Sequence, residues 1–222
     1  TAAVLANMPD RAWRWAAIAE TARGRAVVSL DDAATIAAAL AHYIRAMLHA
    51  AKAREPRLRV QATDYFWEAA WRLGGTRVGR KVLKAPLHCC WDCLKDAPVS
   101  AARVVAALAE CHADDEAWQA GLDVVCDALS RKAHRDAKLL ERRVFLLCKL
   151  GRAADAAHSI KPSDADAPTL AKVWATLARS ACSESDQLAA HERALEITTG
   201  RFDCIQPLIG LGEWLLNRGC LD

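Results

Sequence analysis

The segment from His88 to Cys93 carries the residue types that are most typical of metal chemistry in this sequence. Cys90 and Cys93 have the C-x-x-C spacing of many zinc sites, and His88 would supply a third ligand. A closed zinc site needs four ligands, and Cys111 and His112 on an adjacent helix are the nearest candidates for the fourth. Alternatively, these cysteines pack as small apolar side chains on a helix. We favour the second interpretation, because a single C-x-x-C in an alanine-rich chain is weak evidence, and expect no metal and no cofactor.

Motifs of known catalytic chemistry are missing from the sequence. It contains no glycine-rich phosphate loop, no G-x-S-x-G elbow and no H-E-x-x-H helix. The seven histidines are dispersed, and none lies close to both a nucleophile and a carboxylate in one predicted loop. We therefore expect no catalytic residues and no enzymatic activity.

Basic and aromatic residues are interleaved between Lys52 and Lys84, with nine basic and three acidic residues in this range. Such a mixture can indicate nucleic-acid binding. However, Phe66, Trp67 and Trp71 recur at helical spacing, which favours the interpretation that the rings pack in a core. The cations would then form a solvated face or a patch for an acidic protein partner, and we expect no nucleic-acid partner.

The candidate partner-binding residues of this basic range lie near its end. They are Arg77, Arg80, Lys81 and Lys84. An acidic protein surface such as the outer face of a microtubule is a suitable partner, which makes tubulin one candidate.

The segment Arg11–Val28 combines arginines with Trp13, Trp15 and Ile18. A basic helix with an aromatic anchor is typical of calmodulin targets, so calmodulin is a second candidate partner. The alternative is an ordinary packed helix with Trp15 at a large core position and Ala19 at a small one. We favour this alternative.

The composition indicates an all-α fold. Hydrophobic residues make up 53% of the 222 residues, which excludes wholesale disorder, and alanine, the best helix former, dominates them. No run of about 18 apolar residues is present, so we expect no membrane-spanning helix. Nine cysteines scattered among apolar residues suit free thiols in the reducing cytoplasm. Residues 1–100 carry a net charge of +6 and residues 101–222 one of −3, which suggests two surfaces of different electrostatic character.

A repeat of 34 or 35 residues organises the second half of the chain. Large residues followed by small ones at tetratricopeptide-like spacing recur from Val105, Leu140, Trp174 and Leu208. We predict an all-α solenoid of antiparallel helix pairs, with degenerate tetratricopeptide-like repeats in register over residues 98–222. Residues 1–97 are predicted to form irregular helical pairs, because the register fails there.

Turn residues punctuate the predicted helices. Gly151 is expected to take the left-handed conformation after a helix, and Ser183 to cap the helix that follows it. Pro162 and Gly200 are expected to end helices, and Ser29 to cap one. Gly74, Gly75 and Gly79 predict a break, followed by a short helix over residues 86–96. The last register supplies one helix, over residues 202–218, without its second helix, so we expect a continuation or a partner to cover it.

Three motifs in the second half resemble a known family. They are W-x-x-L-A-R at residues 174–179, Q-L-x-A-x-x-x-A-L at residues 187–195, and G-E-W-L at residues 212–215. These motifs resemble the cilia- and flagella-associated protein 46 family of large tetratricopeptide proteins in the ciliary central apparatus. The resemblance covers about residues 100–222 and does not extend to residues 1–97.

The resemblance implies a structural subunit of a projection on one central-pair microtubule, located in the axoneme of a cilium or flagellum. It implies other large axonemal helical-repeat proteins as partners, with calmodulin expected nearby, and it transfers no catalytic residues. Alternatively, the chain is a regulatory helical-repeat domain of a cytosolic multidomain protein.

Overall fold

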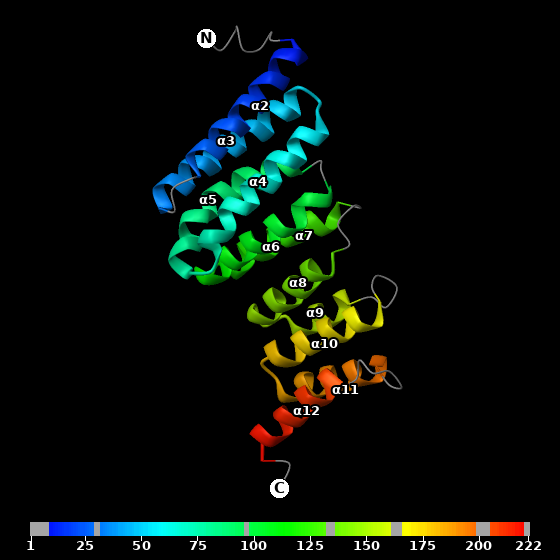
Figure 1. Ribbon diagram of the computed structural model, residues 1–222. Helices are drawn as coiled ribbons and strands as arrows, with labels where there is room; N and C mark the ends of the chain where they lie inside the picture. Colours follow the sequence, from blue (N-terminus) through cyan, green and yellow to red (C-terminus); the bar gives the residue numbers. More distant parts are fainter. Residues whose placement is uncertain are drawn as a thin grey trace. The chain divides into compact units, whose positions relative to one another are not determined.

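The computed structural model describes residues 9–28, 32–95, 98–131, 136–160, 166–198 and 205–219. Every element within these ranges is a helix, and no strand occurs among them, which confirms the predicted all-α class (Figure 1). The chain divides into two compact units, residues 1–115 and residues 116–222. The helix at residues 98–114 belongs to the first unit. The change from irregular pairs to a regular register at residues 97/98 stays a prediction.

The first unit is a stack of five described helices. They are α2 (Asp10–Val27), α3 (Ala33–Lys52), α4 (Pro56–Gly74), α5 (Arg77–Leu94) and α6 (Pro98–Asp114). Short connections such as Gly75–Thr76 reverse the chain, so neighbouring helices pack antiparallel. Each helix contacts the next, and α2 with α4, α3 with α5, and α4 with α6 also pack together. Each helix therefore packs on its sequence neighbours and on the next helix in its own row, which is the arrangement of a solenoid.

Small residues let the helices of the first unit approach closely. Ala39, Ala46 and Ala50 on α3 are fully buried, and Gly24 on α2 faces the ring of Tyr43. A Cβ atom at Gly24 would lie 2.5 Å from Cε1 of that ring, so a larger residue would push α2 and α3 apart.

The helix predicted over residues 86–96 is wrong at its start, because α5 begins at Arg77 and contains Pro86 within it. Thr76 caps this helix, its hydroxyl accepting the N–H of Gly79 at 3.1 Å. Gly79 does not break the helix, and it lies where a Cβ atom would overlap the carbonyl oxygen of Leu73. The cap and the packing of the buried residues Leu83 and Leu87 offset the backbone hydrogen bond that Pro86 cannot donate.

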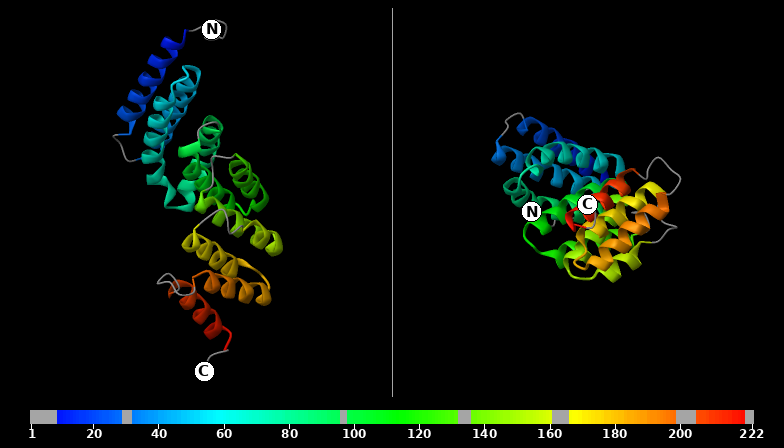
Figure 2. Two further views of the ribbon diagram at one scale, coloured as in Figure 1. Left: turned by 90° about the vertical axis from the view of Figure 1, so that its right-hand side faces the viewer. Right: turned by 90° about the horizontal axis from the view of Figure 1, so that it is seen from below.

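The second unit repeats the stacking of helix on helix. Its described helices are α7 (Trp118–Ser130), α8 (Ala137–Lys149), α9 (Ala153–Ser159), α10 (Ala167–Ser180), α11 (Glu184–Thr198) and α12 (Ile205–Asn217). Helices α8, α10 and α12 form one row, in which α10 contacts both α8 and α12 (Figure 2). Helices α9 and α11 pack against this row. Leu140, Trp174 and Leu208, the three register positions of this unit, fall on α8, α10 and α12 respectively.

Two of the predicted helix ends are confirmed in this unit. Gly151 has φ of 73°, and the N–H groups of Gly151 and Arg152 donate to the carbonyls of Cys148 and Leu147. This is the Schellman arrangement that favours glycine after a helix. The hydroxyl of Ser183 accepts the N–H of Asp186 at 3.4 Å. Ser29, Pro162 and Gly200 lie outside the described residues.

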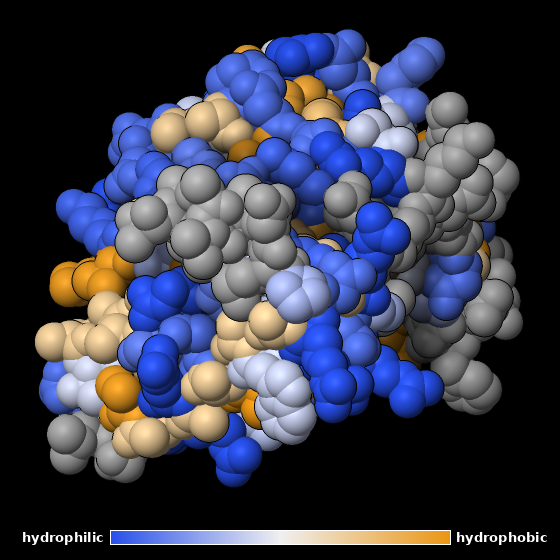
Figure 3. Space-filling view, turned by 90° about the horizontal axis from the view of Figure 1, so that it is seen from above, coloured by the Kyte–Doolittle hydropathy of each residue, from blue (hydrophilic) through white to orange (hydrophobic). Residues whose placement is uncertain are grey.

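Hydrophilic side chains cover most of the described surface on the face drawn in Figure 3, where hydrophobic ones occur in small separate patches. None of the described helices combines the length and the apolar composition that spanning a lipid bilayer requires.

Candidate partner-binding surfaces

A groove of about 590 Å³ opens on the row of α8, α10 and α12 in the second unit. Its apolar part is made of small or ring-shaped residues, Ala171, Ala175 and Pro168 of α10 and Pro207 of α12, together with Ile205. Ile205 is 56% exposed, so a large apolar side chain at the groove remains accessible. A concave site of this volume that combines apolar lining with a few charged groups is typical of binding sites in proteins.

Thr176 connects the polar groups beside this groove. Its side chain is buried, and its hydroxyl donates to Oε1 of Glu141 on α8 at 3.0 Å. Nη2 of Arg179 donates to the same hydroxyl at 3.4 Å. These contacts fix the carboxylate of Glu141 on one wall and position the guanidinium of Arg179 on α10.

Lys172 and Arg179 are the two cations that line the groove, and both are exposed. Glu141 is the single anion among the lining residues and is half-buried. The register positions Trp174 and Leu208 lie on two of the helices that form this groove, α10 and α12. Its lining residues were not predicted, because the register alone does not tell which side chains stay uncovered.

A second candidate surface lies on α4 and α6 of the first unit. Trp67, Trp71 and Ala70 of α4 face Ala107 and Glu110 of α6 across a small pocket of about 70 Å³. Trp71 is 72% exposed. An exposed tryptophan beside an apolar pocket is typical of the anchor residues that dominate binding energy in protein interfaces.

The interpretation of the aromatic residues as core residues is therefore wrong for Trp71. Phe66 is fully buried, Trp67 is half-buried and Trp71 is exposed. Residues 66 and 67 differ by about 100° around the helix, so they cannot share one face. Helical spacing between Trp67 and Trp71 places them together beside the pocket.

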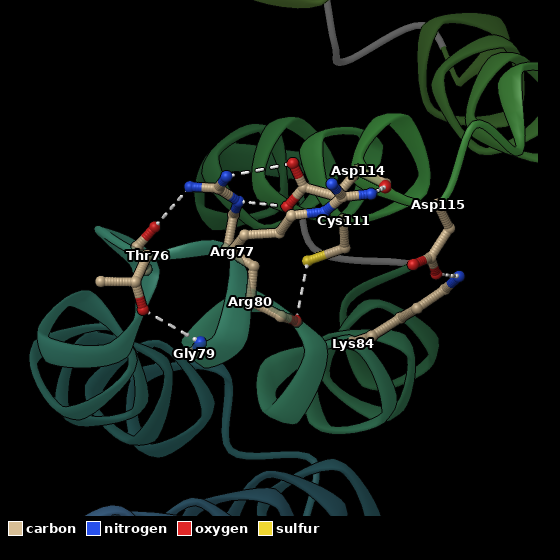
Figure 4. Close-up of polar contacts among 9 residues, drawn as sticks. Thr76, Arg77, Gly79, Arg80, Lys84, Cys111, Asp114 and Asp115 are labelled. Carbon is tan, nitrogen blue, oxygen red and sulfur yellow. Dashed lines mark hydrogen bonds and ion pairs between the residues drawn. The ribbon is translucent and has the colours of Figure 1, made fainter.

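The basic residues predicted to bind a partner lie on α5, and three of the four contact the end of α6 (Figure 4). Nε and Nη2 of Arg80 donate to the carboxylate of Asp114 at 2.5 and 3.0 Å. Nη1 of Arg80 also donates to the carbonyl of Gly74 at 3.0 Å, and Nη2 of Arg77 donates to the backbone carbonyl of Asp114. Nζ of Lys84 lies 2.5 Å from Oδ2 of Asp115.

These contacts alter the acid–base properties of the pairs. Hydrogen bonding to the Asp114 carboxylate raises the pKa of Arg80 above its usual range, and the same bond lowers the pKa of Asp114. The hydrogen bond from Lys84 likewise lowers the pKa of Asp115. Cations at the carboxyl end of a helix are also favoured by its dipole, so Arg77, Arg80 and Lys84 stabilise the fold. Lys81 is exposed on the same helix.

The segment with C-x-x-C spacing is helical and turns its thiols to different environments. Cys90 is fully buried, with Sγ 3.9 Å from the sulfur of Met47, whereas Cys89 is exposed. Burial raises the pKa of Cys90 well above its usual range and that of Cys93 to about 11.

His88, the third proposed zinc ligand, lies edge-on to the ring of His112 with the ring centroids 5.2 Å apart. Among the described residues, no group of three or more His, Cys, Asp or Glu side chains is placed to hold a metal ion.

Helix α2 buries Trp13 and leaves exposed Trp15, the tryptophan that was predicted at a core position. Trp13 is 6% exposed and stacks on His49 of α3 with a centroid distance of 5.2 Å, whereas Trp15 is 62% exposed. The assignment of Trp15 to the core is therefore wrong. Calmodulin wrapped around this helix would have to pull Trp13 out of its packing, so the accessible part of α2 is the face of Trp15 and Ile18.

Glu20 of α2 contacts two side chains of α3, and the sequence offered no reason to predict it as an interacting residue. Its carboxylate accepts hydrogen bonds from Arg45 and Arg23 at 2.9 and 2.7 Å and lies 2.7 Å from Nδ1 of His42. Burial raises the pKa of Glu20, but the bonds from His42, Arg45 and Arg23 outweigh it and lower the pKa to about 2. The negative charge of Glu20 therefore lies at the interface between α2 and α3.

Comparison with known proteins identifies a distant relative. The chain is 28% identical, over 231 aligned residues, to cilia- and flagella-associated protein 46 of Chlamydomonas reinhardtii. The alignment covers 95% of this chain but 8% of that protein, so the chain spans a small fraction of its relative's length. No protein-family model matches the chain. The similarity extends over both units, further towards the amino terminus than the motifs of residues 100–222 indicated.

Proposed function

We propose that this chain is a structural scaffold segment of a ciliary or flagellar central-apparatus projection, where it binds other large helical-repeat proteins and supports motility. The observation that carries the proposal is the similarity over 95% of the chain to a cilia- and flagella-associated protein, in a chain whose described part is helical throughout. The segment acts by binding and not by catalysis.

The architecture supports a scaffold because stacked helices present long, continuous binding surfaces. Two such surfaces carry accessible apolar anchors, Ile205 at the groove of the second unit and Trp71 at the pocket of the first. Partner helices or segments lying on them would be held by shape and charge complementarity. Tubulin and calmodulin remain candidate partners through Lys81 and through the exposed face of α2, respectively.

Cross-linking mass spectrometry on axonemes isolated from cells that carry this protein tests the proposal. We expect the chain in the axonemal fraction, with cross-links from lysines such as Lys81 and Lys172 to other central-apparatus repeat proteins. Recovery of the chain in the soluble fraction alone, without such links, would contradict the ciliary assignment. A regulatory role in a cytosolic multidomain protein would then be the better explanation.

A further inference from the structure

The α10 helix has two faces of different character. Leu170, Val173 and Leu177 are buried in the core of the second unit. Pro168, Ala171, Lys172, Ala175 and Arg179 line the groove instead. The helix therefore presents small residues flanked by two cations, a surface on which another helix can approach closely.

The spacing of the two cations sets a geometric requirement on any ligand. Lys172 and Arg179 are seven residues apart, which corresponds to about 10.5 Å along an α-helix and nearly the same direction around it. Ala175 lies between them at the third position and keeps the space above it free of a large side chain. A complementary ligand should therefore carry two carboxylates about 10 Å apart, with an apolar side chain between them.

The charged residues at the groove determine which charge a complementary ligand must carry. Lys172 and Arg179 are exposed, whereas Glu141, the one anion among the lining residues, is half-buried and accepts the hydroxyl of Thr176. Arg179 donates to the hydroxyl of Thr176 from Nη2 at 3.4 Å, and the guanidinium of this exposed side chain has four further N–H donors that a ligand can use. The accessible charge of the groove is thus positive.

The same spacing distinguishes a helical ligand from an extended one. In an extended strand, about 10 Å corresponds to three residues, and side chains three residues apart point to opposite faces. In a helix, residues seven apart point the same way. The row of α8, α10 and α12 also already packs helix against helix, so a further helix continues an existing kind of contact.

We infer that the groove on α8, α10 and α12 binds an acidic amphipathic α-helix of a partner protein, with carboxylates seven residues apart and an aliphatic side chain between them. The carboxylates pair with Lys172 and Arg179, and the aliphatic side chain lies over Ala175 against Ile205 and Pro207. This inference rests on the proposed scaffold function and names the partner chemistry of its groove.

The test uses the whole chain and a fluorescently labelled peptide of about 20 residues, long enough for an isolated helix to form. The peptide is built from alanine and leucine, with glutamates at seven-residue spacing on the leucine face. A permuted peptide of the same composition has its glutamates on opposite faces, and a third peptide has lysine in place of glutamate. A fourth, with prolines, is acidic but cannot be helical. Fluorescence anisotropy measures the four affinities.

We expect the first peptide to bind at least about tenfold more tightly than the other three, and its binding to weaken with added salt. The double variant Lys172→Glu/Arg179→Glu should lose at least about tenfold in affinity for it. Arg193→Glu, a charge reversal on α11 away from the groove, should bind as the unaltered chain does. Circular dichroism establishes that both variants remain helical.

Equal binding of the first and permuted peptides, or unchanged binding by the double variant, would overturn the inference. Tightest binding of the proline-containing peptide would assign the groove to an extended acidic segment and would also overturn it. Dimerisation of the chain in sedimentation, lost in the double variant, would assign it to a second copy. None of these outcomes depends on cilia, so failure here is distinct from absence of the chain from axonemes.

Discussion

Arg80 on α5 holds the carboxylate of Asp114 on α6 through two hydrogen bonds, from Nε to Oδ2 at 2.5 Å and from Nη2 to Oδ1 at 3.0 Å. The donors of a guanidinium and the two oxygens of a carboxylate match in this geometry, which makes it stronger than a single-point ion pair. The contact ties the last turn of α6 to the first half of α5. Arg80, which was predicted from the sequence to bind a partner, is thus engaged within the first unit.

Removing the Arg80–Asp114 pair should destabilise the first unit. We expect Asp114→Ala and Arg80→Ala each to lower the free energy of unfolding by about 1–2 kcal/mol, because the pair is two-pronged and mostly shielded from solvent. Urea denaturation of the single variants and the double variant isolates the coupling between the two side chains. Strictly additive losses would show that the two residues stabilise the unit independently of their contact.

Glu20 should make the stability of the first unit depend on pH in the acid range. Its pKa falls from 4.5 to about 2 on folding, so its contribution is fully present above pH 4.5 and is lost as pH falls from 4.5 through about 2. A pKa lowered by about 2.5 corresponds to at most about 3.4 kcal/mol. Urea denaturation between pH 2 and pH 7 should show Glu20→Gln less stable than the unaltered chain at pH 7, and the difference should shrink near pH 2. A difference that does not vary with pH would exclude the charge of Glu20 as the cause.

Two of the turns that contain a left-handed residue provide a matched pair. Gly151 and Arg54 both follow a helix, with φ of 73° and 55°. An L-residue pays about 1 kcal/mol in this conformation, so Gly151→Ala should destabilise the chain by about that amount, and Arg54→Gly should stabilise it by up to about 1 kcal/mol. Denaturation midpoints measure both. If each variant changes stability in the direction opposite to the one expected, side-chain contacts at these turns contribute more than the backbone conformation does.

The tryptophans should separate into packing and binding residues. Trp13→Ala removes a buried side chain and should cost about 3–5 kcal/mol, whereas Trp71→Ala should change stability by less than about 0.5 kcal/mol. Thermal unfolding compares the two. A large loss of stability for Trp71→Ala would place that ring in the core and remove the binding surface on α4.

The sequence predicted the features that depend on local chemistry. The register that recurs at Leu140, Trp174 and Leu208 places these residues on α8, α10 and α12, and Gly151 and Ser183 end and begin helices as expected. Small residues at contact positions and turn residues act over a few neighbours along the chain. A single sequence therefore contains enough information to predict them.

Features that depend on which face of a helix is covered were predicted less well. Trp13 and Trp15 are two residues apart and point to nearly opposite sides of α2, and the sequence favoured the wrong one. Ala17 and Gly24, which recur with Trp13 on the buried face, were the available signal, because small residues mark close approach between helices. The pairing of Arg80 with Asp114 could not be predicted, because it joins residues 34 positions apart on different helices.

The most direct test of the proposed scaffold function is to replace the aligned segment of the Chlamydomonas relative with this chain. In Chlamydomonas reinhardtii, the part of cilia- and flagella-associated protein 46 that aligns with this chain is exchanged for the chain, and swimming speed is compared with that of a strain lacking the segment. We predict that the exchanged protein is incorporated into axonemes and restores motility. The exchange carrying Lys172→Glu and Arg179→Glu is predicted to remain helical but to restore motility less well. If the chain is incorporated but motility stays at the level of the strain without the segment, this chain cannot serve as the scaffold proposed here.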